Sequence, residues 1–171
     1  MQSSIEYASG KRENSGVYIG KGALFSIIDK PDSKSIERNI EAINYFASQV
    51  NVPVSLMIVP SASEIQPEKL TDFAVTWSLR DTIADIYSQC DGVECVSVYE
   101  TLKEHSDDYI YYRTDHHWTT YGAYLAYAEY CRARVLLPHD YVAETVSNSF
   151  NGTLYSKSGV RFIKSDTIEA Y

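Results

Sequence analysis

The segment from residue 52 to residue 99 constrains the fold most, because it alternates between strand-like and helix-like patterns. Residues 52–60 form a nearly continuous apolar run with a proline near each end, which is typical of a strand covered on both faces in a parallel sheet. Residues 71–89 carry apolar side chains at helical spacing, and residues 93–99 alternate and are rich in β-branched residues. This order predicts a βαβ crossover and an α/β domain, in which sites form beyond the carboxyl ends of strands.

Two further elements are predicted before the crossover. Residues 16–25 predict two short strands around a glycine-containing turn. Asp32 or Ser33 can cap a helix that runs to about residue 50. The apolar residues of this helix recur on one face, at Ile36, Ile40, Ile43, Ala47 and Val50.

The sequence after residue 99 predicts a second capped helix and then a weaker pattern. Thr119 or Thr120 can cap a helix that runs to about Arg134. From Leu137 to Tyr171 only turns and short extended pieces are indicated. A parallel sheet of two or three strands is incomplete, so we expect a fragment of a longer protein whose fold is incomplete at the C-terminus.

The chain length fits one domain. The first fifteen residues show no periodicity and predict a loose lead-in, which leaves 16–171 as a single α/β domain. The 171 residues are enough to bury a sizeable core.

Charge excludes two classes of partner. The net charge is −8 and no stripe rich in lysine or arginine is present, so neither nucleic acid nor an anionic membrane surface is expected to bind. No apolar run approaches the roughly 18 residues that span a bilayer, and the start lacks the features of a signal peptide. The three cysteines lack the paired spacing of a zinc site.

One cluster of residues, between the extended segment at 109–113 and the helix after Thr119, carries the chemistry. A carboxylate two residues from a histidine can orient the imidazole and stabilise its protonated form, and Asp115 and His117 have this relationship. Arg113 can hold an anion or a substrate oxygen, and Trp118 can form a wall for a sugar ring or an anchor under the loop.

Two other interpretations of this cluster remain open. In the structural one, Asp115 caps the following helix, His116 and His117 are exposed, and Trp118 fills the core. In the other, Asp115 and both histidines bind a metal. The second is disfavoured because adjacent histidines point in different directions and no third ligand has a recognisable spacing, so no metal is predicted.

A serine nucleophile is not evident. The sequence contains neither Gly-x-Ser-x-Gly nor Gly-Asp-Ser. Ser61 and Ser63 follow the predicted strand at 52–60 and are the best internal candidates, although serines at such places more often cap or turn the chain. We expect them to line the cleft.

The run Tyr112-Arg113-Thr114-Asp115-His116-His117-Trp118-Thr119, with Gly122 and Ala123 beyond it, resembles the signature of the bacterial DHHW protein family. Segments 16–20, 59–61 and 150–159 support the resemblance, which therefore covers most of the chain. That family is similar to the alginate O-acetyltransferases of the SGNH-hydrolase-like superfamily, which share an Asp-x-His-Trp motif.

The resemblance implies a fold and a function. The implied fold is SGNH-hydrolase-like (flavodoxin-like), with three layers around a mostly parallel sheet. The implied function is an O-acetylesterase or O-acetyltransferase on cell-surface polysaccharide, in an extracytoplasmic or cell-envelope location, without a cofactor. Asp115 and His117 are then catalytic. The groups expected to bind the acetylated glycan are Arg113, His116, Trp118, Ser61 and Ser63.

The relatives place the nucleophilic serine on a later segment, after a further strand. The resemblance therefore implies that activity depends on such a segment, and these 171 residues alone are expected to be inactive. The alternative function is a non-catalytic carbohydrate-binding or scaffold module with the same fold, which 15 tyrosines would suit.

Overall fold

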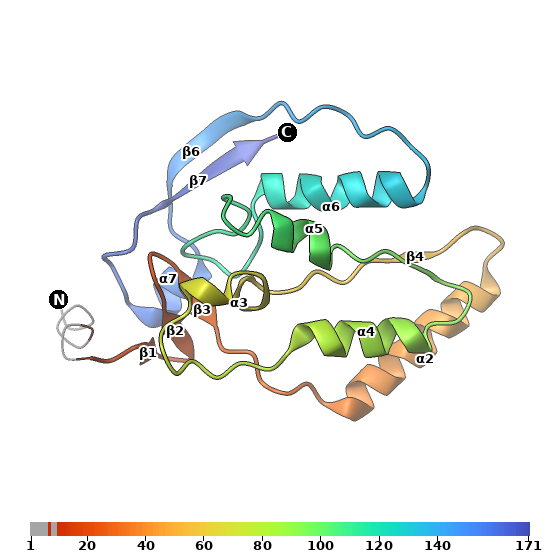
Figure 1. The fold of residues 1–171 in the computed structure, drawn as a ribbon, viewed down its shortest axis with the longest axis horizontal. Coiled ribbons are helices and arrows are strands. Elements are labelled where there is room, and N and C mark those ends of the chain that lie inside the picture. Colours follow the sequence, from red (N-terminus) through yellow and green to blue (C-terminus); the bar gives the residue numbers. More distant parts are fainter. Residues whose placement is uncertain (1–6, 8–9) are drawn as a thin grey trace.

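The computed structural model describes residue 7 and residues 10–171, in which helices alternate with short strands (Figure 1). Much of the predicted lead-in lies outside the described residues. The elements in chain order are β1 (Glu13–Asn14), β2 (Val17–Ile19), β3 (Leu24–Ser26), α2 (Ser33–Gln49), β4 (Ser55–Leu56), α3 (Ala62–Ile65), η1 (Pro67–Lys69), α4 (Leu79–Gln89), β5 (Glu94–Cys95), α5 (Tyr99–Glu104), α6 (Thr120–Ala133), β6 (Glu144–Phe150), α7 (Thr153–Ser158) and β7 (Asp166–Ala170).

The predicted hairpin is confirmed as strands β2 and β3 of an antiparallel sheet. β1 adds a third strand at its edge, so the end of the predicted lead-in is ordered by backbone pairing. Gly20 stands in the turn, where an added Cβ would lie closer than 3.0 Å to the Lys69 carbonyl oxygen and to the Phe25 ring. Only glycine fits this approach without a shift.

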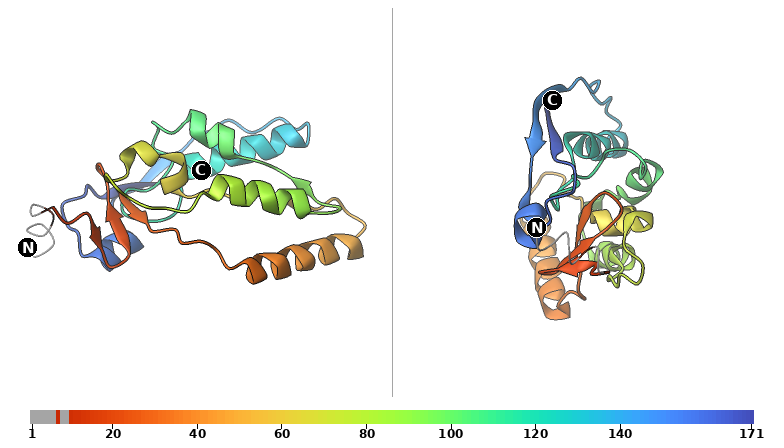
Figure 2. Two further views of the ribbon diagram at one scale, coloured as in Figure 1. Left: turned by 60° about the horizontal axis from the view of Figure 1, so that its bottom comes forward. Right: turned by 90° about the vertical axis from the view of Figure 1, so that its left-hand side faces the viewer.

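Helix α2 begins where the sequence predicts. Asp32 is its N-cap, and the carboxylate of Asp32 accepts a hydrogen bond of 2.9 Å from the backbone N–H of Ser35. Ile40 is buried on the predicted apolar face. α2 contacts α4; the two helices overlap at the end of α4 in Figure 1 and lie one above the other in the left view of Figure 2.

The predicted crossover is confirmed, because β4 and β5 pair in parallel and α4 connects them. Two ladder bonds of 2.9 Å extend the pairing, from the Glu94 N–H to the Val54 carbonyl and from the Val96 N–H to the Leu56 carbonyl. The prediction of a strand covered on both faces is wrong for the described residues: Val52 and Val59 are 66% and 36% exposed. Among the described residues β4 pairs with β5 alone, so it is an edge strand of a two-stranded sheet and not the central strand of a larger one.

Helix α4 starts eight residues later than its apolar periodicity predicts. Ser78 is its N-cap. The preceding segment is irregular, with a turn at Asp72–Phe73, because Tyr18 holds its backbone: the Tyr18 hydroxyl lies 3.0 Å from the Val75 carbonyl and 3.1 Å from the Val75 N–H. The backbone N–H of Trp77 donates to the Ile28 carbonyl at 3.0 Å. Tertiary contacts thus override the local helical pattern.

The C-terminal part forms an antiparallel hairpin, β6 and β7, with α7 between the strands. Two register shifts interrupt the pairing, and most of β6 is exposed. An exposed, irregular strand carries no hydrophobic alternation, which is why the sequence indicated only turns and short pieces here. Among the described residues, β4 and β5 are the one parallel pair, and the other two sheets are antiparallel.

Two apolar clusters pack on either side of the loop that carries Asp115 and His117. The first joins α3, α5 and α6 to the segment that precedes residues 115–118, the Asp-His-His-Trp run called the DHHW motif below. It does so through residues such as Ile65, Leu102 and Ile110. The second joins the β2–β3 hairpin to α7 through Val17, Leu24 and Leu154 and their neighbours. The motif lies between a helical core and α7. None of the helices described is both long and apolar enough to cross a bilayer.

Candidate active site

The DHHW motif forms a closed loop at the start of α6. Tyr111 and Trp118 make an isolated antiparallel bridge across its base, and the Tyr112 N–H donates to the His117 carbonyl at 3.2 Å. The Thr119 side chain caps α6 by accepting from the Gly122 N–H at 3.2 Å. The loop is therefore held at both ends by backbone bonds before its side chains are considered.

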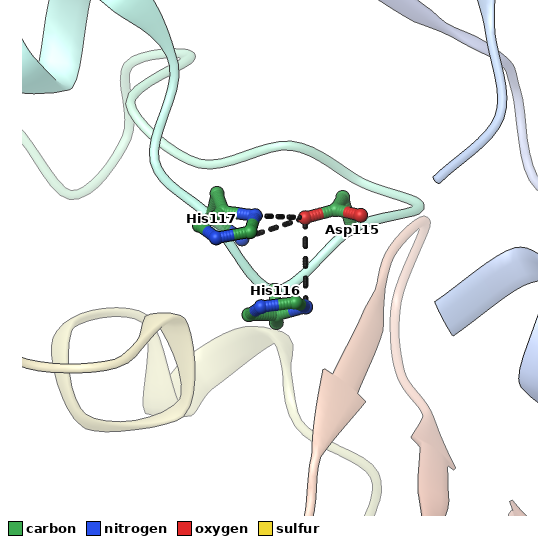
Figure 3. A group of neighbouring side chains, drawn as sticks. All are labelled: Asp115, His116 and His117. Atoms are coloured by element: carbon green, nitrogen blue, oxygen red, sulfur yellow. Dashed lines mark hydrogen bonds and ion pairs between the residues drawn. The ribbon is translucent and has the colours of Figure 1, made fainter. Parts of the chain in front are cut away.

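Asp115 and His117 face one another in this loop (Figure 3). The Oδ1 of Asp115 lies 2.6 Å from Nδ1 of His117 and accepts a second bond of 3.0 Å from the His117 backbone N–H. An ionised carboxylate only accepts, so this contact assigns the proton to Nδ1 and leaves a lone pair on Nε2. Asp115 is 4% exposed, whereas the His117 side chain is 66% exposed.

The second oxygen of Asp115 is bound by a distant segment. Oδ2 accepts from the Thr153 N–H at 2.7 Å and from the Thr153 hydroxyl at 2.9 Å, at the first turn of α7. Asp115 therefore does not cap the following helix α6, as the structural interpretation held, but binds the first residue of α7. A Cβ on Gly152 would lie closer than 3.0 Å to the Asp115 side chain, so this approach requires glycine.

These hydrogen bonds keep Asp115 ionised. Burial raises the pKa of Asp115, but the hydrogen bonds from Thr153 and His117 outweigh burial and bring the pKa to about 2. A buried, ionised carboxylate of this kind orients an imidazole and stabilises its protonated form.

Acid titration should reveal this carboxylate. The pKa of Asp115 in the folded protein lies below its ordinary value of 3.8, so its contribution to stability is present above about pH 4 and is lost as the pH falls toward 2. We expect the free energy of unfolding, measured with urea between pH 5 and pH 2, to fall more steeply for the wild type than for Asp115→Asn. Other acidic groups titrate equally in both proteins. Parallel curves would contradict the assignment.

A second buried carboxylate, which sequence reasoning missed, holds the backbone in front of Asp115. Asp166, the first residue of β7, is 0% exposed. It accepts from the N–H groups of Arg113 and Thr114 at 2.7 and 2.8 Å, and also from the hydroxyls of Tyr109 and Thr114. Burial of the Tyr109 hydroxyl and its hydrogen bond to Asp166 raise the pKa of Tyr109. No local signal marks Asp166, because its partners lie more than fifty residues earlier.

A cavity of about 370 Å³ opens beside the Asp–His pair. Its walls come from the β3 region, the segment after β4, the start of α4, the motif loop and α7. They are mainly apolar and include the hydroxyl groups of serines and the imidazole groups of His116 and His117. The lining includes Phe25, Ile28, Pro60, Ser61, Ser63, Leu79, Tyr111, Asp115, His116, His117, Trp118 and Leu154.

Of the predicted site residues, the structure brings all but one to this cavity. Arg113 lines a separate polar cavity of about 260 Å³, together with Lys21 and Lys69. Its guanidinium lies over the Tyr109 ring at 4.2 Å and 3.5 Å from Asp166. Sequence proximity placed Arg113 at the site, but these contacts turn its side chain away.

Ser61 and Ser63 face one another. Their hydroxyl oxygens lie 2.9 Å apart, and Ser63 is buried. Among the described residues neither hydroxyl bonds an imidazole of the motif. In that part of the chain the Nε2 atoms of His116 and His117 likewise have no side-chain partner. Both serines line the cavity, as expected from their position after the strand.

Asp115, His116 and His117 also form a group of potential metal ligands, with one ligand atom from each within 4.8 Å of the others. Both oxygens of Asp115 already accept two hydrogen bonds each, and the Nδ1 atoms of both histidines are engaged. Two free Nε2 atoms are fewer than the three protein ligands of a catalytic zinc site. The donor set as arranged does not fit a resident metal.

The fold is α/β, and its site pairs a buried carboxylate with an exposed imidazole beside an apolar cavity, the arrangement of a general base in hydrolases and acyltransferases. The chain belongs to the DHHW protein family, since that family's model matches residues 9–171. No match was found among curated protein sequences.

Solved structures share this fold. A DHHW family protein from Eubacterium siraeum is 29% identical, with a TM-score of 0.76 over 93% of this chain and 55% of that one. PatB1 from Bacillus cereus is 19% identical, with a TM-score of 0.71 over 91% and 57%. The O-acetyltransferase domain of Pseudomonas putida AlgJ is 22% identical, with a TM-score of 0.66 over 90% and 63%. The chain thus spans little more than half the length of these relatives.

Proposed function

We propose that this chain is the acid–base half of an acyl-transfer enzyme that removes or transfers O-acetyl groups on cell-surface polysaccharide. The observation that carries the proposal is the 2.6 Å contact between Asp115 Oδ1 and His117 Nδ1. It leaves Nε2 of His117 free as a base beside the cavity. His117 is the general base, and Asp115 orients it.

The fold similarity supports this reaction class. AlgJ is described as carrying an O-acetyltransferase domain, and the present chain resembles that domain over most of its own length. We extend the likeness to an SGNH-hydrolase-like, three-layer arrangement around a parallel sheet, in which β4 and β5 are the first parallel strands. An extracytoplasmic location follows from the same family resemblance.

The chemistry needs a hydroxyl nucleophile at Nε2 of His117. In the forward step this hydroxyl attacks the carbonyl carbon of an acetyl ester while Nε2 takes its proton, and ionised Asp115 stabilises the resulting imidazolium. His117 then returns the proton to the leaving sugar oxygen, and the acetyl group remains on the nucleophile. Water or a second sugar hydroxyl, deprotonated in turn by His117, then attacks the acetyl carbon; the bond from this carbon to the nucleophile oxygen breaks, and His117 returns the proton to that oxygen. The family resemblance assigns the nucleophile to a serine on a later segment, with Ser61 and Ser63 as polar lining groups.

Trp118 and His116 complete the proposed substrate contacts. Trp118 packs partly against the apolar core and partly lines the cavity, so its ring is fixed and presents one wall to a ligand. His116 lines the same cavity and is half exposed. Arg113 stays outside this set because its guanidinium is held by Asp166 and Tyr109.

The test is acetate release. The protein is produced from the whole open reading frame that contains these residues and is incubated with p-nitrophenyl acetate and with O-acetylated alginate or peptidoglycan. We expect acetate release, or acetyl transfer to added unacetylated glycan, above the level of a His117→Ala blank. Equal rates for the two proteins would contradict the proposal. Saturable glycan binding with equal, background turnover would instead favour the carbohydrate-binding module.

A further inference from the structure

The Thr153 hydroxyl contacts both halves of the motif. Its Oγ1 lies 2.9 Å from Asp115 Oδ2 and 2.9 Å from Nδ1 of His116. Thr153 is the first residue of α7, and its own backbone N–H already binds Asp115. The backbone N–H alone joins the start of α7 to Asp115, so the hydroxyl is not required for that link. The hydroxyl adds a separate hydrogen bond to His116.

The single hydroxyl proton decides the direction of both bonds. Ionised Asp115 can only accept, and a bond to a charged acceptor is the stronger one, so the Thr153 hydroxyl donates to Asp115. Its oxygen then accepts from Nδ1–H of His116. The imidazole of His116 is thereby held with its proton on Nδ1 and a lone pair on Nε2, as His117 is.

The carboxylate of Asp115 therefore determines which ring nitrogen carries the proton in both His116 and His117. Oδ1 of Asp115 binds His117 directly, and Oδ2 binds His116 through Thr153. The two rings lie side by side, with centroids 3.9 Å apart and planes at 38° (Figure 3). Both line the same cavity. His117 Nδ1 has the direct bond of 2.6 Å that stabilises an imidazolium. His116 Nδ1 lies 3.6 Å from Asp115 Oδ1, beyond hydrogen-bond distance, and its hydrogen bond of 2.9 Å goes to the neutral Thr153 hydroxyl, so the two histidines are suited to different tasks.

We propose that Thr153 is a positioning residue that couples His116 to Asp115 and holds His116 as a hydrogen-bond acceptor for a hydroxyl group of the sugar beside the ester. The coupling rests on geometry alone, and its use in sugar binding rests on the proposed function. A sugar hydroxyl is the group that a neutral Nε2 lone pair recognises, and the carbonyl of an acetyl group is not.

The coupling is tested by the tautomer of His116. Nitrogen-15 NMR of the labelled protein at alkaline pH, where imidazoles are neutral, distinguishes Nδ1–H from Nε2–H. In the wild type we expect Nδ1–H for both histidines. Thr153→Val removes the hydroxyl at similar volume and should shift His116 toward Nε2–H, and Thr153→Ser should restore the wild-type spectrum. Ser156→Ala is the control, since among the described residues the Ser156 hydroxyl bonds the carbonyl of Gly152, the N-cap of the same helix, and neither Asp115 nor His116.

Each outcome either supports or overturns the coupling of His116 to Asp115 through Thr153. A wild-type His116 with Nε2–H overturns it without any variant, so the test stands even where Thr153→Val fails to fold. A folded Thr153→Val protein whose His116 keeps Nδ1–H also overturns it, because a purely structural threonine would give that result.

A kinetic measurement tests the use in sugar binding separately. The loss of one neutral hydrogen bond predicts a KM for the acetylated glycan that is roughly 3- to 10-fold higher in Thr153→Val, with recovery in Thr153→Ser. An unchanged KM, together with the expected tautomers, would overturn the sugar contact and leave the coupling. Expected tautomers in a protein that turns over no ester would mean that the proposed function has failed instead.

Discussion

Replacing Asp115 by asparagine is expected to lower the rate of acetyl-ester turnover by roughly 10³- to 10⁴-fold, because the amide disrupts the bond that assigns the His117 proton. The amide side chain carries donors as well as an acceptor, and an NH₂ group facing Nδ1 favours the tautomer with the proton on Nε2. That tautomer cannot accept a proton from a nucleophile. The rate constant is measured on the acetylated glycan, with background set by His117→Ala.

The chain offers a matched control for this substitution. Asp108 forms a second aspartate–histidine pair, with its Oδ2 at 2.7 Å from Nδ1 of His105, but this pair does not line the cavity beside His117. Asp108→Asn should leave the turnover within about 2-fold of the wild type, as expected for a surface substitution. A similar loss in both variants would indicate a general effect of charge, and an unchanged rate in Asp115→Asn would remove Asp115 from the mechanism.

Replacing Asp166 by asparagine should have the largest effect on stability. Both oxygens of this fully buried carboxylate accept from backbone N–H groups, so an NH₂ group in place of either oxygen must face a donor. A buried donor without an acceptor costs about 1–3 kcal/mol, and the lost charge weakens the remaining bonds. We expect the free energy of unfolding to fall by roughly 3 kcal/mol and the Tm by about 6–12 °C.

Urea unfolding and thermal melting measure these quantities. Asp85→Asn is the control, because Asp85 lies on the exposed surface of α4 and its carboxylate bonds only Gln89 in the same helix. It should change the free energy of unfolding by no more than about 0.5 kcal/mol. If Asp166→Asn were as stable as Asp85→Asn, the carboxylate would not be the anchor of the loop.

The local patterns that sequence reasoning uses were sufficient for much of this fold. The β2–β3 hairpin, the Asp32 cap of α2, the crossover between β4 and β5, and the Thr119 cap of α6 each depend on residues that are near one another in the chain. The contact between Asp115 and His117 is predictable for the same reason. These residues are two positions apart and share one loop.

The anchors of the site were not predictable because they depend on distant polar contacts. Thr153 lies 38 residues after Asp115, and Asp166 lies 53 residues after Arg113. A threonine after a glycine and an acidic residue at the start of a strand are common, and neither has a period or a spacing that points to a partner. Arg113 shows the converse case, since its nearness to Asp115 in the sequence suggested a place beside the Asp–His pair, whereas its side chain lines a separate cavity and contacts Asp166 and Tyr109.

The dependence of the motif on Asp166 also has a consequence for protein synthesis. A ribosome makes the DHHW loop long before it makes β7, so the nascent chain exposes this loop without the carboxylate that binds the backbone N–H groups of Arg113 and Thr114. Until residue 166 has left the exit tunnel and the β6–β7 hairpin has closed, the motif loop is held by its local contacts alone. An unfinished chain therefore carries the whole motif before the buried acceptor that anchors the preceding residues is in place.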